Sequence, residues 1–350
     1  MELTQDQIEF RDLIRTFFAE NVSSEYVRSR IESSVAVDSG LWRTLEQLGL
    51  NEGFCGADAP FGVEELSLVA EESGASLLPE PLWERLMCGG VFPRLLPAGE
   101  QQAYRTAING KETAIAPREA CTLKCDAKGK GLSGDVAWCF GGAGAGRVVA
   151  VAQAGSQERV VVFDVEGDGV TAQPHSSLDL TARLVGFSLK KAACCVLSEG
   201  ASRLFLQLTE LMKAAEVYGI TRRVIDVTCE YVKTREQFGV PVGGFQAVQQ
   251  KLADAYATSE ALIALVRFAA WSIVASPEQR ALTTRAAISY ASQVGPSVCE
   301  VAMQCHGGIG FTWEYDLHLY LRRVKVIEMA FPHSEARARE LITLAGQGRT

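Results

Sequence analysis

The sequence lacks the long apolar run that a membrane-spanning helix requires. No uninterrupted apolar stretch among its 350 residues reaches the roughly 18 residues needed to cross a bilayer. The first ten residues, MELTQDQIEF, are polar and amphipathic, and they do not resemble the apolar segment of a signal peptide. We therefore expect a cytoplasmic protein with no membrane span.

Positive charge is also scarce. Lys and Arg number 34 against 42 Asp and Glu, which gives a formal net charge of -8. No stretch alternates basic and aromatic residues in the way that nucleic-acid-binding segments do. These features argue against a nucleic-acid partner, so an anionic ligand would have to meet a local cluster of Arg and Lys.

The spacing of the metal-binding residue types excludes the common metal sites. The ten cysteines contain no repeated C-x-x-C pair, and the four histidines are too far apart to form a ligand pair. We expect reduced structural thiols and no metal site. His306 alone stands out, because it lies inside a glycine-rich motif that we expect it to line.

Three blocks of different character are present. Residues 1–110 have helical periodicity, residues 111–198 carry short β-branched runs, and residues 199–350 are helical again. With 47% hydrophobic residues, the chain can form more than one core. We predict a multidomain α+β protein with an N-terminal helical domain, a central antiparallel β-barrel or sandwich, and a C-terminal four-helix bundle.

The first helix illustrates the helical pattern. Thr4 is predicted to cap its N-terminus together with Gln7. The apolar residues at helical spacing predict one buried face: Phe10, Leu13, Ile14 and Phe17, with Phe18 at its edge.

The central block contains RVVAVA, ERVVVFDV and GVTAQP, which are runs typical of strands. The tract GGAGAG at 141–146 lacks the G-x-G-x-x-G register and does not begin a helix, so it predicts a turn between strands and not a dinucleotide site.

The third block is organised around YVKTREQFGVPVGGFQAVQQKLAD, residues 231–254. A long helix is expected to end near Arg235, and a second helix to start at Phe245 after a glycine- and proline-rich break. Arg235 offers planar donors suited to phosphate, Phe238 offers a surface for a flat ring, and Gln237 can bond a base edge or ribose. The alternative is that Arg235 only caps the helix and Phe238 is a core residue.

A second motif, QCHGGIGFTWEYD, occupies residues 304–316. Glycines at 307, 308 and 310 allow backbone amides to approach a ligand closely or to adopt positive φ. The alternative is an ordinary glycine C-cap and turn.

Taken together, RxQFG, FQxVQxxLAD and, about fifty residues later, QxxGGxGFTxE resemble the C-terminal helical domain of the acyl-CoA dehydrogenase family. The resemblance implies FAD as cofactor, an acyl-CoA substrate that loses two hydrogens from Cα and Cβ, and an electron-transfer flavoprotein as acceptor. It also implies that one subunit contacts the adenine and pyrophosphate end of FAD held mainly by its neighbour. The residues that match these contacts are Arg235, Gln237, Phe238, Gln246, Gln304, Gly307 and Gly308.

The catalytic carboxylate of the family is missing from its expected places. One position corresponds to Phe331, which Pro332 and His333 follow, and the other to Thr209. Neither Phe331 nor Thr209 acts as a base at neutral pH. Glu210 is one residue away, about 100° around the helix. The family's flavin-binding threonine-glutamate-proline loop is replaced by APREACTLKC at 116–125.

These gaps leave three interpretations. The first is a non-catalytic subunit that completes the FAD site of a homologous catalytic subunit in an α2β2 heterotetramer, of the kind that acts in steroid side-chain degradation or fatty acid β-oxidation. The second is a self-sufficient homotetrameric dehydrogenase with a displaced base such as Glu210. The third is a flavin-free scaffold or assembly subunit. On the first interpretation, the chain has no catalytic residue of its own.

Overall fold

The computed structural model describes residues 2–56, 58–126, 131–332 and 335–347; His333, which follows the position of the family base, lies outside these ranges. Its first part is helical. A π-helical turn at Met87–Val91 follows α6, and the helices are α1 (Gln5–Asn21), α2 (Ser24–Glu32), α3 (Ser39–Gln47), α4 (Leu50–Cys55), α5 (Val63–Ala75), α6 (Leu82–Leu86), α7 (Phe92–Arg94) and α8 (Ala98–Ile108).

Helix α1 confirms the predicted cap and corrects one predicted core residue. Thr4 and Gln7 form a capping box, in which each side chain bonds the other residue's backbone N–H. Leu13 is 51% exposed, so its assignment to the buried face is wrong. Packing against α5 selects a narrower face that leaves Leu13 outside, made of Phe10, Ile14, Phe17 and Phe18.

The central part forms one curled sheet of eight strands in the order β6-β7-β3-β2-β4-β5-β8, with β1 attached to β4. Most neighbours are antiparallel, as predicted, but β1 and β2 pair with β4 in parallel. The strands are β1 (Thr113–Ile115), β2 (Lys124–Cys125), β3 (Leu132–Cys139), β4 (Arg147–Ala154), β5 (Gln157–Asp164), β6 (Val170–Pro174), β7 (Val185–Ala192) and β8 (Cys194–Val196).

Alternation along the strands gives the sheet two buried faces. In β4, Val149 and Val151 join the core shared with the helices, whereas Val148 and Ala150 join a second core inside the curl. The glycines at 141–146 lie between β3 and β4, which confirms the predicted turn.

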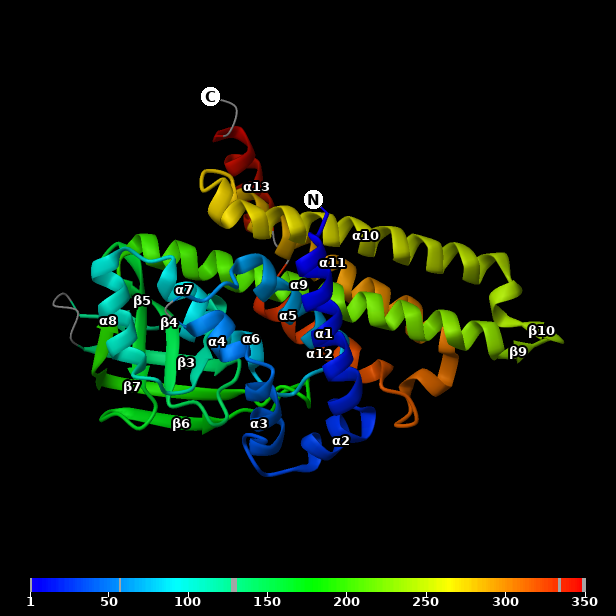
Figure 1. Cartoon of the computed structure of the whole chain (residues 1–350), viewed down its shortest axis with the longest axis horizontal. Coiled ribbons are helices and arrows are strands. Elements are labelled where there is room, and N and C mark those ends of the chain that lie inside the picture. Colours follow the sequence, from blue (N-terminus) through cyan, green and yellow to red (C-terminus); the bar gives the residue numbers. More distant parts are fainter. Residues whose placement is uncertain (1, 57, 127–130, 333–334, 348–350) are drawn as a thin grey trace.

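The last part is a helical bundle of α9 (Glu199–Thr234), α10 (Gln246–Ala275), α11 (Arg280–His306) and α12 (Leu317–Ala330), followed by α13 (Glu335–Gln347). This confirms the predicted four-helix arrangement. Helix α9 is the longest element: one end runs beside the sheet and the other projects with α10 away from it (Figure 1).

Helix α10 is long and apolar enough to span a membrane by length and composition, since an 18-residue window has a mean hydropathy of 1.4. Only 39% of that window is buried within the chain. The helix packs on α9 and α11 along one face and leaves Tyr256, Phe268 and Val274 exposed.

Candidate functional site

The first sequence motif forms a β-hairpin at the far end of α9. Helix α9 ends at Thr234 and Arg235 follows as its C-cap, after which β9 (Glu236–Gln237) pairs with β10 (Val240–Pro241). Phe238 and Gly239 connect the strands and both have positive φ, 54° and 80°, as a tight type I′ turn requires. The predicted break between two helices is therefore an ordered hairpin.

The residues of this hairpin are available to a ligand or partner. Phe238 is 94% exposed, so the alternative that placed it in the core is wrong. Gln237 and Gln246 are exposed as well. The exposed Arg235 side chain makes no hydrogen bond or ion pair within the described ranges.

The second motif forms the glycine turn that follows α11. Gly307 has φ 66° and ψ −146°, a conformation that essentially only glycine adopts. Gly308 has ordinary φ, and a Cβ atom built on it would meet nothing within 4 Å. Internal packing therefore gives no reason for glycine at 308, which is consistent with a backbone that something outside the chain approaches. Gln304 is exposed one turn earlier.

An aromatic stack brings the two motifs together. The Tyr231 ring, on the last turn of α9, lies 4.1 Å from the His306 ring at the end of α11, with 17° between their planes. The imidazole Nδ1 of His306 donates to the Ala302 carbonyl at 2.9 Å, and burial lowers the pKa of His306. The ring of Tyr315 makes T-shaped contacts with the rings of both Tyr231 and His306. His306 therefore has a structural role, which the sequence showed only as proximity to the glycines.

We call the seven predicted residues around this stack the distal surface: Arg235, Gln237, Phe238, Gln246, Gln304, Gly307 and Gly308. The hairpin projects at one end of the molecule, and the sheet lies at the other (Figure 1). A ligand bound at the distal surface would therefore not reach the sheet of the same chain.

The two positions expected for a base lie in the interior and carry no titratable group. Phe331 ends α12, is buried, and its carbonyl accepts a 2.8 Å hydrogen bond from Ser292. Thr209 is buried in α9 and donates to the Phe205 carbonyl at 2.9 Å.

Helix α13 contributes a contact to Phe331. Its residue Arg337 places a guanidinium 5.6 Å from the centre of the Phe331 ring and forms an ion pair with Glu119. Glu119 belongs to the 116–125 segment, where we expected the family's flavin-binding loop and found a different sequence. Arg337 therefore contacts both Phe331, one of the positions expected for a base, and Glu119 of the 116–125 segment.

Glu210 is held in an ion pair. Its carboxylate lies 3.0 Å from Arg285, whose other nitrogen is 3.5 Å from Glu340. Burial raises the pKa of Glu210 to about 7, against the lowering effect of Arg285 and Arg337. A carboxyl group with this pKa could accept a proton near neutral pH, as a general base does. In Glu210, however, the carboxylate is paired with the guanidinium of Arg285.

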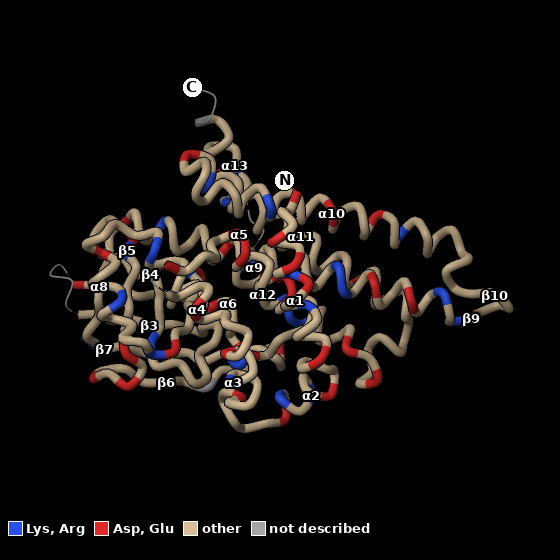
Figure 2. The backbone as a smooth tube through the Cα atoms, in the orientation of Figure 1, with Lys and Arg blue, Asp and Glu red and all other residues tan. Residues whose placement is uncertain are grey.

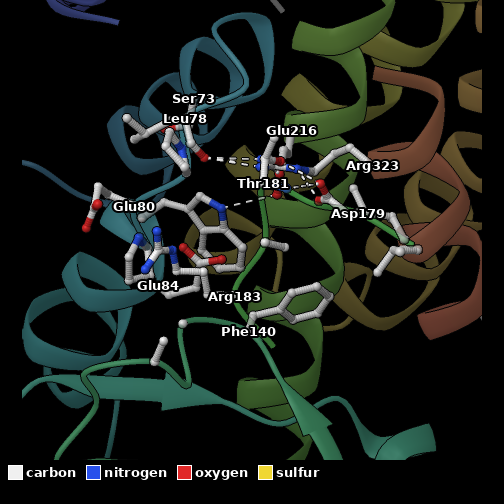
Figure 3. Close-up of a pocket in the computed structure, with 18 of the residues that line it drawn as sticks. Ser73, Leu78, Glu80, Glu84, Phe140, Asp179, Thr181, Arg183, Glu216 and Arg323 are labelled. Atoms are coloured by element: carbon white, nitrogen blue, oxygen red, sulfur yellow. Dashed lines mark hydrogen bonds and ion pairs between the residues drawn. The ribbon is translucent and has the colours of Figure 1, made fainter. Parts of the chain in front are cut away.

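Between the helices and the sheet lies a buried group of charges that we call the interior ion cluster: Glu84, Asp179, Lys213, Glu216 and Arg323. Lys213 is 2.8 Å from Glu216 and 3.3 Å from Glu84. Arg323 is 3.0 Å from Glu216 and 2.6 Å from Asp179 (Figure 3). The ammonium of Lys213 also lies 3.8 Å from the centre of the Phe140 ring.

The cluster fills almost all of the space that it lines. The remaining cavity measures about 40 Å³, enough for only a few water molecules. Burial raises the pKa of Glu84, whereas for Glu216 the charges of Lys213 and Arg323 outweigh burial and lower the pKa. The paired charges of the chain itself therefore occupy most of this space.

Sequence analysis missed this cluster. The available signal was a pair of opposite charges three residues apart, Lys213 and Glu216, in the otherwise apolar stretch LMKAAEVYGI of α9. Charges on a buried helix face need partners from other elements. Those partners come from α6, α12 and the loop before β7, positions far apart in sequence.

Comparison with known proteins decides the family. A model described as the acyl-CoA dehydrogenase C-terminal domain matches residues 201–342. The acyl-CoA dehydrogenase IpdE2 of Mycobacterium tuberculosis is 30% identical over 319 residues, which cover 89% of each chain. The chain belongs to the acyl-CoA dehydrogenase family. IpdE2 of Mycolicibacterium smegmatis is 29% identical over 331 residues, covering 92% of this chain and 93% of the relative.

The fold is that of the same family. The structure of the ChsE4–ChsE5 complex from Mycobacterium tuberculosis superposes with a TM-score of 0.85 at 24% identity, covering 99% of this chain and 98% of that one. Acyl-CoA dehydrogenases are flavoprotein oxidoreductases that act on acyl-CoA thioesters, and their cofactor is FAD. The predicted family, fold and cofactor are thus confirmed.

Proposed function

We propose that this chain is the non-catalytic subunit of a heteromeric acyl-CoA dehydrogenase, in which it completes an FAD site on a homologous catalytic subunit. The proposal rests on the difference between two parts of this chain, the distal surface and the interior. The distal surface is exposed, whereas the space beside Phe140 is largely occupied by the chain's own charged side chains and Phe331 is buried.

The distal surface fits one end of FAD. The guanidinium of Arg235 has free donors for a pyrophosphate, and the Phe238 ring offers a flat surface. The open backbone at Gly307 and Gly308 lets amide groups approach a phosphate or ribose. The amides that would bond the adenine or ribose are Gln237, Gln246 and Gln304.

The space lined by the interior ion cluster does not fit the flavin ring. A cavity of about 40 Å³ has no room for a three-ring system, and opening it would separate Lys213 from Glu84 and Glu216. Exposing or unpairing buried charges is costly, so the cluster resists such an opening. When bound, FAD would accept the electrons removed from the substrate; its ring and the base would belong to the partner.

The reaction proposed for the complex is α,β-dehydrogenation of an acyl-CoA thioester, with an electron-transfer flavoprotein as acceptor. The acyl-CoA dehydrogenase relatives support this reaction. The structural neighbour named as a ChsE4–ChsE5 complex supports an assembly of two different chains, such as an α2β2 heterotetramer. We propose a substrate from steroid side-chain degradation or fatty acid β-oxidation.

Co-expression with the catalytic partner tests the proposal. The partner is a homologous chain that carries glutamate at the position matching Phe331. We expect the present chain alone to be colourless and inactive, and the co-purified complex to be yellow and to dehydrogenate an acyl-CoA. A yellow, active homotetramer would instead support the displaced-base interpretation with Glu210. A complex that never gains flavin would support the scaffold interpretation.

A further inference from the structure

A large groove, lined in part by Arg85 of α6, shares no lining residue with the cavity beside the interior ion cluster. It has a volume of about 680 Å³ and is lined by α3, the turn after α6, the end of α8 and the start of β1. We call it the Trp42 groove. Its charged lining residues are Arg43, Glu46, Arg85, Arg105, Lys111 and Glu112.

Arg85 is the most buried of these cations. Its side chain is 10% exposed, and its guanidinium lies 3.9 Å from the centre of the Trp42 ring. Its Nε is 2.7 Å from a carboxylate oxygen of Glu112. Its Nη2 is buried and has no hydrogen-bond partner within the described part of the chain. A buried guanidinium donor without a partner is costly unless something else accepts its hydrogen bond.

Two further guanidiniums on the groove have no carboxylate partner in the described ranges. Arg43 donates only to the backbone carbonyl of Ser39, at 3.2 Å, and Arg105 makes no ion pair. Both side chains are exposed, so they can turn toward a ligand without disturbing the core. Lys111 completes the set, although it also lies 3.3 Å from Asp164.

The balance of charge in the groove differs from that of the whole chain. Four cations face two carboxylates, Glu46 and Glu112, whereas the protein as a whole has a net charge of -8. Elsewhere acidic and basic residues are interspersed along the backbone (Figure 2). Guanidinium groups bind phosphate oxygens through paired donors, and a dianion would balance the excess of two cations.

We propose that the Trp42 groove binds an organic phosphate of about nucleotide size. The exposed guanidiniums of Arg43 and Arg105 would contact its phosphate groups, Arg85 would add positive charge behind them, and the ring of Trp42 would form part of the wall. The volume lies within the range of small-molecule sites, and it exceeds what an inorganic anion needs. This site is separate from the distal surface and does not depend on the proposed role in FAD binding.

Calorimetric titration at low ionic strength tests the proposal, with ADP and inorganic pyrophosphate as probes. We expect saturable binding at one site. Arg43→Ala and Arg105→Ala should each weaken ADP binding by about 10- to 100-fold, because each removes a charged hydrogen bond. Glu46→Gln should tighten it by about two- to fivefold, because it removes a repelling charge on the surface.

Two control variants show whether binding depends on the arginines of this groove or on arginines elsewhere in the chain. Arg203→Ala removes another exposed guanidinium, on α9, and should leave binding unchanged. Arg235→Ala, on the distal surface, should also leave it unchanged. The proposal is overturned if neither probe binds. It is overturned equally if binding survives Arg43→Ala and Arg105→Ala but is lost in Arg235→Ala, because the probe would then occupy the distal surface.

Discussion

Tyr231 and His306 stack nearly parallel, with ring centroids 4.1 Å apart, and this contact joins the end of α9 to the end of α11. Arg235 follows one turn after Tyr231, and Gly307 follows His306 directly. The stack therefore fixes the spacing between the hairpin and the glycine turn. On our account, these are the two parts of the distal surface that together contact one end of FAD.

The first prediction concerns Arg235. In the complex with the catalytic partner, Arg235→Ala should weaken FAD retention by about 10- to 150-fold, since a charged hydrogen bond contributes roughly 1.5–3 kcal/mol. Turnover at saturating FAD should stay close to wild type, because the ring and the base lie on the partner. Arg235→Lys should recover only part of the affinity, because an ammonium lacks the planar fork.

Titration of FAD into these variants, with turnover as readout, separates affinity from chemistry. Arg203→Ala is a suitable control, because it removes an exposed arginine from α9, the helix that Arg235 follows as C-cap. If maximal turnover collapses while FAD affinity is unchanged, Arg235 acts near the reacting carbons and the assignment is wrong.

The second prediction compares two adjacent glycines. Gly308→Ala should leave the thermal stability of the chain unchanged, because the added Cβ meets nothing within 4 Å. It should still weaken FAD binding by the complex, because the methyl group would stand between the backbone and the cofactor. Gly307→Ala should lower stability by about 1–3 kcal/mol, since its positive φ strains any other residue. Melting curves and FAD titrations of both variants distinguish these effects, and unchanged FAD affinity in Gly308→Ala would remove Gly308 from the site.

The third prediction concerns Glu210. Burial raises the folded-state pKa of Glu210 from an ordinary 4.5 to about 7. The protonated Glu210 therefore contributes fully to the free energy of unfolding below pH 4.5, and this contribution is lost as the pH rises through 7. Glu210→Gln cannot titrate, so the wild type should lose roughly 3 kcal/mol more than this variant between pH 4.5 and 8. Urea unfolding at several pH values measures the difference.

The same variant tests the displaced-base interpretation. Turnover of the complex should be nearly intact in Glu210→Gln, because a residue paired with Arg285 contributes no proton transfer. Loss of a general base normally lowers the rate by about 10² to 10⁴. A drop of that size, with the fold intact, would show that this chain supplies the base.

The fourth prediction uses two Lys–Glu pairs on α9. Lys213→Met should destabilise the chain by about 3–5 kcal/mol, because it leaves Glu84 and Glu216 buried with one cation fewer. Lys233→Met breaks a pair of similar length, 2.6 Å to Glu230, but both of its side chains are exposed. This control should show no measurable change, since water solvates both groups. Equal effects in denaturant unfolding would mean that the buried Lys213 pairs contribute no more to stability than an exposed pair.

Local patterns in the sequence predicted much of this fold. Thr4 and Gln7 identified the first cap, the alternating runs identified the strands, and the glycines at 141–146 marked the turn between β3 and β4. These features depend on residues close together in sequence. Leu13 was misplaced because its exposure depends on the angle at which α5 packs against α1, which periodicity does not determine.

The candidate site was predictable to different degrees. Resemblance to a family located the residues of the distal surface, but it did not predict the hairpin turn at Phe238 or the stack of Tyr231 on His306. The interior ion cluster escaped prediction because its partners meet only in the folded chain: Arg323 is 107 residues from Glu216 and 144 from Asp179. Pairings at such separations leave no local pattern.

The flavin content of the purified complex tests the central claim most directly. The complex of this chain with its catalytic partner is denatured, the released FAD is quantified by absorbance, and each chain is quantified separately. The account predicts one FAD for each pair of unlike chains, because only the partner holds a flavin ring while this chain contributes its distal surface. One FAD for every chain would show that the interior of this chain accommodates a flavin ring and would contradict the account.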